Sequence, residues 1–301
     1  MLAVSGGVDS MALVFLFQEL GLNYGIAHCN FKLRETDAEL DTKLVEKTAS
    51  QLQKELYKVY FNTEEYATKN SISTQMAARD LRYQWFELLC STNYYTHIAT
   101  AHHQNDVLET SIFNLSKGTG IAGLHGILPK SGKVIRPILF ALKSDIMTYA
   151  KDNVLEWRDD ASNNENKYSR NLIRNEVVPL LKRINPNLER TFEQNTEKLA
   201  AVEAIFNKQI ELFIQKNIHK QTNKFILNIE VLKTTKVPVM YLFEWIKKYD
   251  FNYFQAKEII KSFENQSGKI FYSTDYQLVR ERKELVLFPL LRKETTISTS
   301  T

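Results

Sequence analysis

The sequence predicts an α/β fold in its first half, a doubly wound parallel sheet of about five strands, followed by a mainly helical part with a small C-terminal strand region. Three observations lead to this. Short apolar runs alternate with longer amphipathic stretches up to about residue 140, which is typical of parallel strands covered by helices on both faces. Amphipathic stretches then follow one another without strands between them. Three strand-like runs end the chain.

Each element of the first half has a simple local pattern. We expect strands at residues 2–4, 24–28, 56–61, 97–101 and 134–135. We expect helices between them at residues 11–20, 36–53, 74–90 and 106–116. The second of these helices opens with a capping box formed by Thr36 and Glu39.

The second half is predicted to be mostly helical. We expect helices at residues 143–153, 172–184, 187–215, 239–249 and 253–263, and strands at 269–272, 277–281 and 285–288. Pro186 lies where the longest helix begins, a position that proline favours. We place a domain boundary at residue 185, which gives domains of residues 1–185 and 186–301. The polar end, residues 293–301, is expected to be disordered.

Composition excludes several classes of protein. The 301 residues are 44% hydrophobic and 25% charged, as in an ordinary soluble globular protein. We find neither an apolar window long enough to span a membrane nor a signal peptide. Cys29 and Cys90 are far apart and lack CxxC partners, so we expect no disulfide framework, zinc site or iron–sulfur cluster, and a cytoplasmic location.

Charge is spread unevenly along the chain. Residues 1–150 hold 14 Lys and Arg against 15 Asp and Glu, a net charge of −1, and residues 151–301 hold 25 against 20, a net charge of +5. A solvated, lysine-rich surface explains this as well as a polyanionic partner does.

Residues 5–10, SGGVDS, follow the first expected strand and open a helix. Gly6 and Gly7 allow a sharp turn close to a ligand, and the following helix points its N-terminal amides there. The segment is therefore either an anion site with two serine hydroxyls or a tightly packed helix cap. The segment matches neither the Walker A pattern GxxxxGK[ST] nor the dinucleotide-binding pattern GxGxxG. Asp9 favours the anion site, because a carboxylate beside phosphates requires Mg²⁺ or an amine.

A second polar cluster follows the fourth expected strand. Asp106 and Glu109 are three residues apart, so they share a helix face and can hold a cationic group. His102 and His103 do not have the HExxH spacing of a zinc helix. For each histidine, a helix cap or polar surface position is as good an explanation as a ligand contact.

These two segments are expected to face one cavity. The first and fourth strands are not consecutive, and in a doubly wound sheet their C-terminal ends meet where the strand order reverses, which is where ligands bind. The glycine-rich residues 116–126, headed by Lys117, are a loop beside that cavity or a long turn. Arg79, Arg82 and Tyr83 share one helix face, which suits phosphate contacts or a solvated surface.

Together these segments resemble the PP-loop family of N-type ATP pyrophosphatases and, within it, the tRNA(Ile)-lysidine synthetases. The matching segments occur in that family's order: SGGVDS, AHCNFKLRE, AARDLRY, ATAHHQNDVLET, GTGIAGLHGI, VIRPIL and WRDDASNNENKYSRNLIRNEVVPLL. The last, residues 157–181, is the most specific, because its DxSN and RNxIR elements link the catalytic domain to tRNA-binding helices. The resemblance is strong over residues 2–185 and continues to about 290.

The resemblance implies an adenine nucleotide alpha hydrolase-like fold and an ATP-dependent ligase. Such an enzyme adenylates the C2 carbonyl oxygen of the wobble cytidine in the isoleucine tRNA with a CAU anticodon. The ε-amine of free L-lysine then attacks C2, which gives lysidine and releases AMP, after pyrophosphate has left in the first step. ATP with Mg²⁺, L-lysine and this tRNA are the implied partners, and the family's precedent is a homodimer.

The resemblance also implies residue roles. The ATP contacts would be Ser5, Gly6, Gly7, Val8, Asp9 and Ser10, with Asp9 also binding Mg²⁺. The catalytic residues would be Asp9, Asp106, Glu109, Arg79 and Arg82. Contacts to lysine or nucleotide would come from His102, His103, Asn105, Asn30, Lys32 and Arg34. The tRNA contacts would be Arg170, Asn171, Arg174 and Lys117.

The chain departs from the family pattern in two ways. Many relatives carry an acid where this chain has Asn105, so we place the acid role on Asp106. Many relatives are also longer at both ends, and a central strand of three residues is short. We therefore expect the natural protein to start upstream of Met1, and the C-terminal domain to be either truncated or shortened. The alternative functions are a PP-loop tRNA thiolation enzyme, which usually needs further cysteines, and a non-catalytic tRNA-binding relative.

Overall fold

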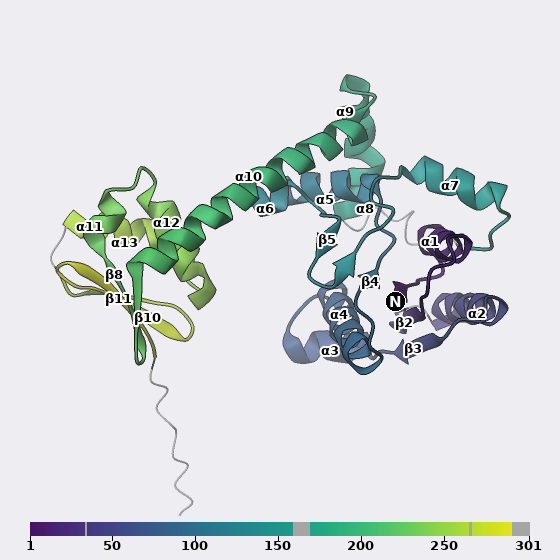
Figure 1. The fold of residues 1–301 in the computed structure, drawn as a ribbon, viewed down its shortest axis with the longest axis horizontal. Helices are drawn as coiled ribbons and strands as arrows, with labels where there is room; N and C mark the ends of the chain where they lie inside the picture. The colour runs from purple at the N-terminus through teal and green to yellow at the C-terminus, as the bar shows by residue number, and fades with distance from the viewer. Residues whose placement is uncertain (34, 159–168, 265–266, 291–301) are drawn as a thin grey trace, which may run out of the picture. The chain divides into compact units, whose positions relative to one another are not determined.

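The computed structural model describes residues 1–33, 35–158, 169–264 and 267–290 (Figure 1). Its contacts divide the chain into two compact units, Met1–Ala201 and Val202–Thr301, and helix α10 (Leu188–Asn217) contributes to both. The domain boundary that we place at residue 185 remains a prediction. Arg34 and the polar end that we expect to be disordered lie outside the described residues.

The first unit alternates strands and helices, as the sequence predicts. Its strands are β1 (Leu2–Ala3), β2 (Ile26–Asn30), β3 (Leu56–Tyr60), β4 (Ile98–Ala99), β5 (Lys130–Ser131) and β6 (Val134–Ile135). Its helices are α1 (Val8–Glu19), α2 (Glu35–Gln51), α3 (Thr63–Asn70), α4 (Thr74–Thr92), α5 (Gln104–Lys117), α6 (Ile121–Leu124), α7 (Lys143–Asp152), α8 (Ser169–Leu172) and α9 (Val178–Ile184), with a π-helical turn at Ile173–Val177.

The strands form one sheet in the order β3-β2-β1-β4-β6-β5. β1 pairs in parallel with β2 on one side and β4 on the other, so the strand order reverses there. This confirms the predicted parallel α/β sheet and places the C-terminal ends of β1 and β4 side by side. The structure adds a sixth strand, β5, which pairs antiparallel with β6 at the edge of the sheet.

Helices cover both faces of this sheet. Successive strand residues point to opposite faces. Leu2 and Ile26 pack in one apolar cluster with residues of α1, α2 and α7. Ala27 and Ile98 point the other way, where they pack against Phe86 of α4. Because both faces are buried, the strands read as short apolar runs rather than alternating ones.

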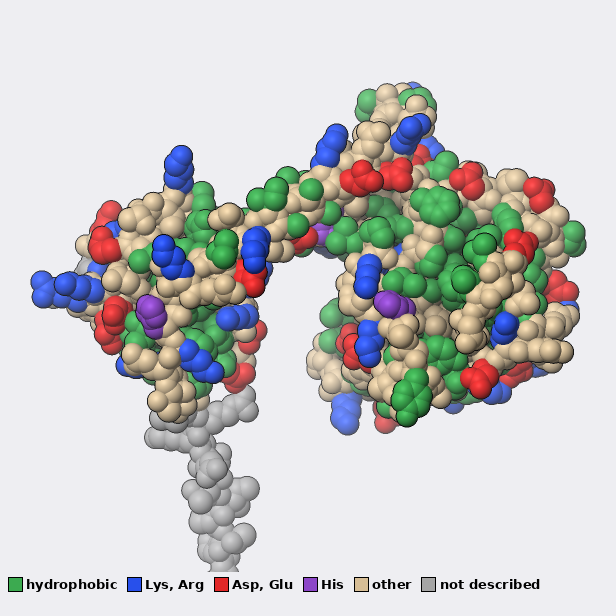
Figure 2. All heavy atoms as spheres, viewed as in Figure 1, with side chains coloured by type: hydrophobic (Ala, Val, Ile, Leu, Met, Phe, Trp, Pro, Cys, Tyr) green, Lys and Arg blue, Asp and Glu red, His purple; other side chains and the backbone are tan. Residues whose placement is uncertain are grey.

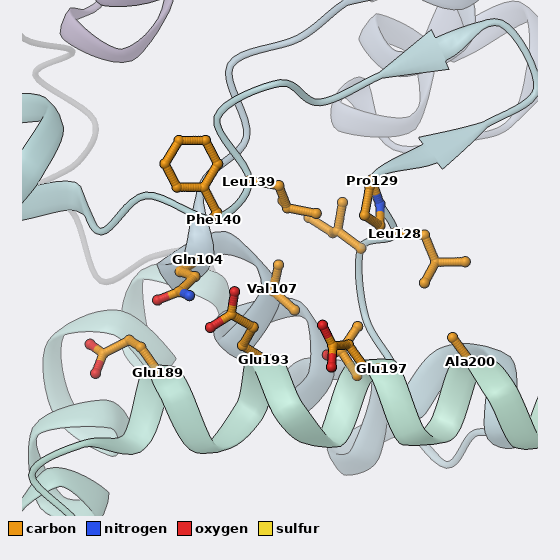
Figure 3. Close-up of a pocket in the computed structure, with 12 residues that line it drawn as sticks. Gln104, Val107, Leu128, Pro129, Leu139, Phe140, Glu189, Glu193, Glu197 and Ala200 are labelled. Carbon is orange, nitrogen blue, oxygen red and sulfur yellow. The ribbon is translucent and has the colours of Figure 1, made fainter.

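The first turns of α10 pack against the same unit. The Thr196 hydroxyl donates to the His125 carbonyl at 3.1 Å, which fixes α10 beside the glycine-rich residues 116–126. Glu189 accepts a hydrogen bond from Lys182 Nζ at 2.7 Å. A pocket lies between this part of α10, the start of α5 and the segment that contains Phe140 (Figure 3).

The second unit contains a five-stranded antiparallel sheet in the order β7-β8-β11-β10-β9. Its strands are β7 (Ile218–Gln221), β8 (Lys224–Asn228), β9 (Lys269–Tyr272), β10 (Tyr276–Arg280) and β11 (Glu284–Pro289). Its helices are α11 (Ile229–Lys233), α12 (Pro238–Ile246) and α13 (Tyr253–Lys261), with 3₁₀ turns at Lys247–Tyr249 and Ser262–Glu264. Trp245 and Leu242 of α12 pack on Leu227, Leu278 and Leu287 of the sheet.

The strand content of this unit exceeds our prediction. The three C-terminal strands are confirmed, but β7 and β8 were not predicted. Ile226 and Leu227 of β8 are both buried, so exposed and buried side chains do not alternate along this strand and its sequence lacks a clear period of two.

Figure 2 shows basic and acidic side chains interspersed on the visible face of this unit, so the positive excess does not form a single-sign patch there. None of the described helices is long and apolar enough to cross a membrane.

Candidate functional site

The loop between β1 and α1 is closed by the hydroxyl of Ser10. Its Oγ accepts hydrogen bonds from the amides of Ser5 and Gly6, each at 3.2 Å, and donates to the Gly7 carbonyl at 2.9 Å. Gly6 has a φ of +96°, which residues with side chains rarely adopt. Gly7 is the extended N-cap residue of α1. The N-terminus of α1 therefore faces the C-terminal edge of the sheet, as an anion site requires.

Arg158 links this loop to helix α2. Its backbone amide donates to the Gly6 carbonyl at 3.1 Å. Its guanidinium donates to Asp41 at 2.8 Å and to Asp37 at 3.0 Å, both on α2. These contacts hold the loop against α2. The sequence did not single out Arg158, because nothing local in the chain shows that residues 150 positions apart meet.

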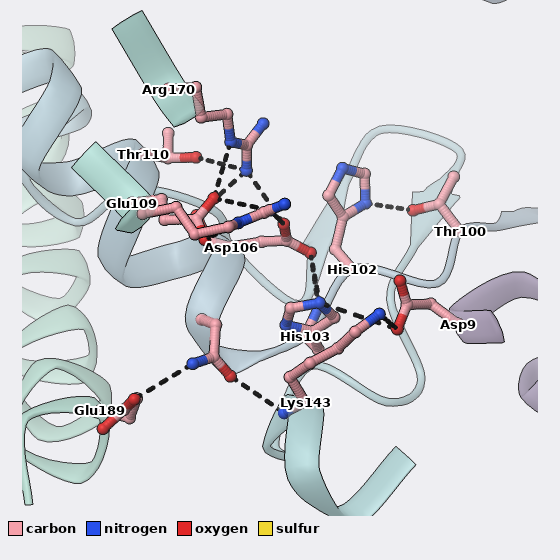
Figure 4. A network of polar contacts seen from close by, with 12 residues as sticks. Asp9, Thr100, His102, His103, Asp106, Glu109, Thr110, Lys143, Arg170 and Glu189 are labelled. Atoms are coloured by element: carbon pink, nitrogen blue, oxygen red, sulfur yellow. Dashed lines mark hydrogen bonds and ion pairs between the residues drawn. The ribbon is translucent and has the colours of Figure 1, made fainter. Parts of the chain in front are cut away.

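Asp9 already has a cationic partner in this structure. Lys143 Nζ, at the start of α7, lies 2.6 Å from Asp9 Oδ1 (Figure 4). His103 Nε2 lies 3.8 Å from the same oxygen. We expected a cation at Asp9, and the structure provides a lysine that the sequence analysis had not selected.

The acid pair on α5 is neutralised by two arginines. Asp106 Oδ2 accepts the backbone amide of the N-cap residue His103 at 3.0 Å, so the Asp106 carboxylate caps the start of α5. Asp106 Oδ1 accepts Arg170 Nη2 at 3.1 Å. Glu109, which is 3% exposed, accepts Arg174 Nε at 2.7 Å and Arg170 Nε at 3.1 Å. In this structure the cationic partners of the two acids are arginines of the same chain, and their contact with a cationic group of a ligand remains a prediction.

These contacts shift the pKa values of the charged groups. Burial alone would raise the pKa of Asp106, but the nearby His103 and Arg170 outweigh it and lower that pKa below its usual value. The hydrogen bond to Glu109 raises the pKa of Arg174. Two carboxylates and two guanidinium groups leave the cluster with no net charge.

The four residues that we expected to contact tRNA lie in different settings. Arg170 and Arg174 are paired with the acids of α5. Asn171 is half-buried in α8. Lys117 is exposed in the last turn of α5, and its Nζ lies 5.7 Å from the centre of the Phe113 ring. Nothing in the structure tests a tRNA contact of these four residues, and the ion pairs of Arg170 with Asp106 and Glu109 argue against a phosphate contact there.

A cavity of about 280 Å³ opens at the C-terminal edge of β1 and β4. Of the predicted site residues it is lined by Ser5, Asp9, Ser10, Arg79, Arg82, His102, Asp106 and Arg170. The structure thus brings together segments from the loop after β1, from α4, from the loop after β4 and from α8. Gly6, Gly7, Val8, Asn30, His103, Asn105 and Glu109 are not among the lining residues.

The cavity is suited to an anionic ligand. Arg79 lies over the Tyr83 ring and Arg82 over the Phe31 ring, with Cζ 4.9 Å and 5.0 Å from the ring centres. Burial lowers the pKa of Arg82, but an arginine stays charged at neutral pH. Burial also lowers the pKa of His102 to about 4, so its ring, 2.8 Å from the Thr100 hydroxyl, is neutral.

The two asparagines that we expected to contact lysine or nucleotide have partners within the chain. Asn105 Nδ2 donates to Glu189 at 3.1 Å, and its Oδ1 accepts the backbone amide of Lys143 at 2.9 Å. An amide can do both, whereas a carboxylate could not donate to Glu189. The neutral residue at 105 therefore joins α5, α7 and α10. Asn30 Nδ2 donates to Glu39 and Thr42, each at 3.2 Å, and so fixes the loop after β2.

The donor set suits Mg²⁺ with a nucleotide better than a metal held by protein alone. Within the described ranges, no group of three or more His, Cys, Asp and Glu side chains could hold a metal ion. Mg²⁺ is usually held by one or two carboxylates together with substrate phosphates and water. Asp9 and Asp106 offer such carboxylates, since their oxygens lie 3.8 Å and 3.6 Å from the same atom, His103 Nε2.

The cysteines are poor nucleophiles. Cys29 lines the cavity, and burial raises the pKa of its thiol to about 12. Burial also raises the pKa of Cys90. Only a thiolate attacks effectively, so neither sulfur is activated at neutral pH.

Comparisons with known proteins agree with this geometry. Residues 1–181 match the family model described as PP-loop domain, and residues 220–290 match the TilS substrate binding domain. A tRNA(Ile)-lysidine synthase of Porphyromonas gingivalis is 38% identical over 97% of this chain and 64% of its own length. One from Bacteroides thetaiotaomicron is 36% identical over 95% of this chain and 66% of its own length. The chain thus spans about two thirds of the length of these relatives.

A solved structure shares the fold. The U34-tRNA thiolase NcsA of Methanococcus maripaludis, solved with its [4Fe-4S] cluster, has a TM-score of 0.56 and 17% identity. The match covers 66% of this chain and 71% of that one. At this identity the likeness concerns the fold alone.

Proposed function

Because this chain belongs to the PP-loop family, we propose that it uses ATP to attach L-lysine to C2 of the wobble cytidine in the isoleucine tRNA with a CAU anticodon. The observation that carries the proposal is the single cavity in which the loop of Asp9 meets the acid–arginine cluster of Asp106 and Arg170. The two reactions need neighbouring sites, one for the triphosphate and one for an ammonium group. The relatives' printed name, tRNA(Ile)-lysidine synthase, supports the same assignment.

In the first step the loop at residues 5–10 would bind the phosphates of ATP. The amides at the start of α1 and the guanidinium groups of Arg79 and Arg82 would face the negative charge. Mg²⁺, held by Asp9 and by phosphate oxygens, would supply charge neutralisation for the departing pyrophosphate. The C2 carbonyl oxygen of the cytidine bonds to the α-phosphorus, and the bond from that phosphorus to pyrophosphate breaks.

In the second step the lysine amine replaces AMP. Its nitrogen bonds to C2, the bond from C2 to the adenylate oxygen breaks, and AMP leaves. Asp106 is ionised at neutral pH, because its pKa is lowered. It would orient the incoming ammonium group, while a carboxylate of this cluster or water accepts the amine's proton. Glu109 would act through Arg170 and Arg174, which it holds by ion pairs.

The cysteines favour lysine transfer over thiolation. A persulfide route needs a reactive thiolate, and burial keeps Cys29, the cysteine in the cavity, protonated. We also propose, from the family precedent, that the protein works as a homodimer in a reducing cytoplasm.

Incorporation of labelled L-lysine into the CAU isoleucine tRNA tests the proposal. We expect incorporation that requires ATP and that fails with the methionine tRNA that carries the same anticodon. Asp106→Asn should abolish transfer while ATP still binds. Thiolated tRNA from a persulfide donor, with no incorporated lysine, would show that the reaction is the alternative one.

A further inference from the structure

We call the cavity at the ends of β1 and β4, where we propose that ATP binds, the ATP cavity. A second cavity, of about 240 Å³, lies elsewhere in the first unit (Figure 3). Its walls are mainly apolar and include Val107 of α5, Leu128 and Leu139 of the segment around β5 and β6, and Phe140. It shares no lining residue with the ATP cavity. The Phe140 side chain is 70% exposed, so its ring forms an accessible part of the cavity wall.

A buried amide points into this apolar pocket. Gln104 is 8% exposed, and its side chain is directed between Phe140 and the α10 helix (Figure 3). Its backbone amide donates to the Ala141 carbonyl, but within the described residues its side-chain amide has no hydrogen-bond partner. The amide of this mostly buried residue is therefore open to the cavity, where it can bond a polar atom of a ligand.

Carboxylates from α10 face the same space. Glu189, Glu193 and Glu197 follow one another every four residues, so they lie on one side of the helix. Glu189 is neutralised by Lys182. Glu193 and Glu197 have no cationic partner among the residues that the structure describes. Their carboxylates face the apolar wall (Figure 3), where a cation would be stabilised more than in water.

The spacing of these groups suggests the shape of the ligand. Residues four apart on an α-helix are separated by a rise of about 6 Å. That is close to the distance between two ammonium groups joined by three or four methylenes. The methylenes would cover the apolar wall, and an ammonium group would also be attracted to the exposed face of Phe140. Phosphates and carboxylates would be repelled by the glutamates.

We propose that this pocket binds a linear aliphatic diamine or polyamine. One ammonium group contacts Glu193, the second contacts Glu197, and an amine hydrogen donates to the Gln104 carbonyl oxygen. The proposal is independent of the reaction proposed above, because it involves none of the residues that line the ATP cavity.

Calorimetric titration of the full chain with putrescine, and separately with spermidine, tests this in low salt without ATP or tRNA. We expect saturable binding with about one site per chain. The double variant Glu193→Gln/Glu197→Gln should weaken putrescine binding at least about tenfold. Gln104→Leu should weaken it as well. The matched control is Glu64→Gln/Glu65→Gln, which removes two acids from the first turn of α3 and should leave binding unchanged.

Three outcomes would overturn the proposal. The first is absence of saturable binding of either amine. The second is equal weakening in the α3 control, which would mean attraction to overall charge only. The third is binding of L-lysine as tight as that of putrescine and equally sensitive to the α10 double variant, because a free amino acid carries the carboxylate that this pocket should repel.

Discussion

Lys143 Nζ lies 2.6 Å from Asp9 Oδ1, so a lysine from the start of α7 neutralises the carboxylate at the start of α1. Asp9 and Lys143 are both partly exposed, so this ion pair contributes little to stability, about 0–1 kcal/mol. Its importance is in the position of the charge. A cation already lies at the carboxylate that we propose as a Mg²⁺ ligand, so Lys143 and the ion would compete for Asp9.

The first prediction separates the two members of this pair. Asp9→Asn should lower the rate of ATP-dependent lysine transfer by about 100-fold, because an amide cannot hold Mg²⁺ beside the phosphates. Lys143→Met is the matched control, since it breaks the same ion pair but leaves the carboxylate. We expect Lys143→Met to keep most of the activity, measured as initial rates at saturating ATP. Equal losses in both variants would mean that the ion pair itself is what the reaction needs.

The second prediction concerns the buried acid of α5. Glu109→Gln should lower the free energy of unfolding by about 1–2 kcal/mol, because both partly exposed arginines lose their ion pair with this buried carboxylate and keep their contacts with Asp106. Urea unfolding followed by circular dichroism measures this. Glu230→Gln, which removes an exposed partner of Lys233, should change it by less than about 0.5 kcal/mol. If Glu109→Gln also changed the free energy of unfolding by less than about 0.5 kcal/mol, water would replace the lost ion pairs and the prediction would be wrong.

The third prediction is a pH dependence with a defined sign. His102 binds a proton with a pKa of about 4 in the folded chain and about 6.5 when unfolded. The unfolded chain therefore binds more protons between these values, and stability falls as the pH is lowered. From pH 7 to pH 5 the contribution is about 1–2 kcal/mol. His102→Asn should flatten this part of the curve of unfolding free energy against pH, and His97→Asn should not.

The fourth prediction concerns Arg170 and the salt dependence of tRNA binding. The sequence suggested a phosphate contact, but the structure pairs Arg170 with Asp106 and Glu109. A cluster without net charge releases few counterions from RNA. Arg170→Ala should therefore leave the slope of log K against log salt concentration unchanged, although lysine transfer falls. A slope smaller by about 0.7–0.9 would instead establish one phosphate contact.

Much of the ATP cavity could be predicted from the sequence. The loop at Gly6 and the acids near Asp106 both follow short apolar runs, and parallel strand ends meet at one edge of a sheet. The partners of these residues could not be predicted. Lys143 and Arg158 reach the loop from more than 130 residues away, and no local pattern indicates that they do so.

The helix and strands that the sequence did not predict also depend on contacts that no local pattern shows. Helix α3 (Thr63–Asn70) is short and buries only Thr63 and Ala67, so its sequence has little apolar periodicity. β7 is mostly exposed and pairs with β8, whose own pairing with β11 depends on contacts distant in sequence. Asn105, where the resemblance led us to expect an acid, donates to Glu189 on α10, which a carboxylate could not do and which no local pattern indicates.

Our central claim is that the cavity at the ends of β1 and β4 uses ATP to activate a base of tRNA. Exchange of labelled pyrophosphate into ATP, measured with and without the CAU isoleucine tRNA, tests it most directly. We predict exchange only when that tRNA is present, lost in Asp9→Asn and retained in Lys143→Met. Exchange that requires lysine alone, or exchange that is unaffected by Asp9→Asn, would contradict the claim.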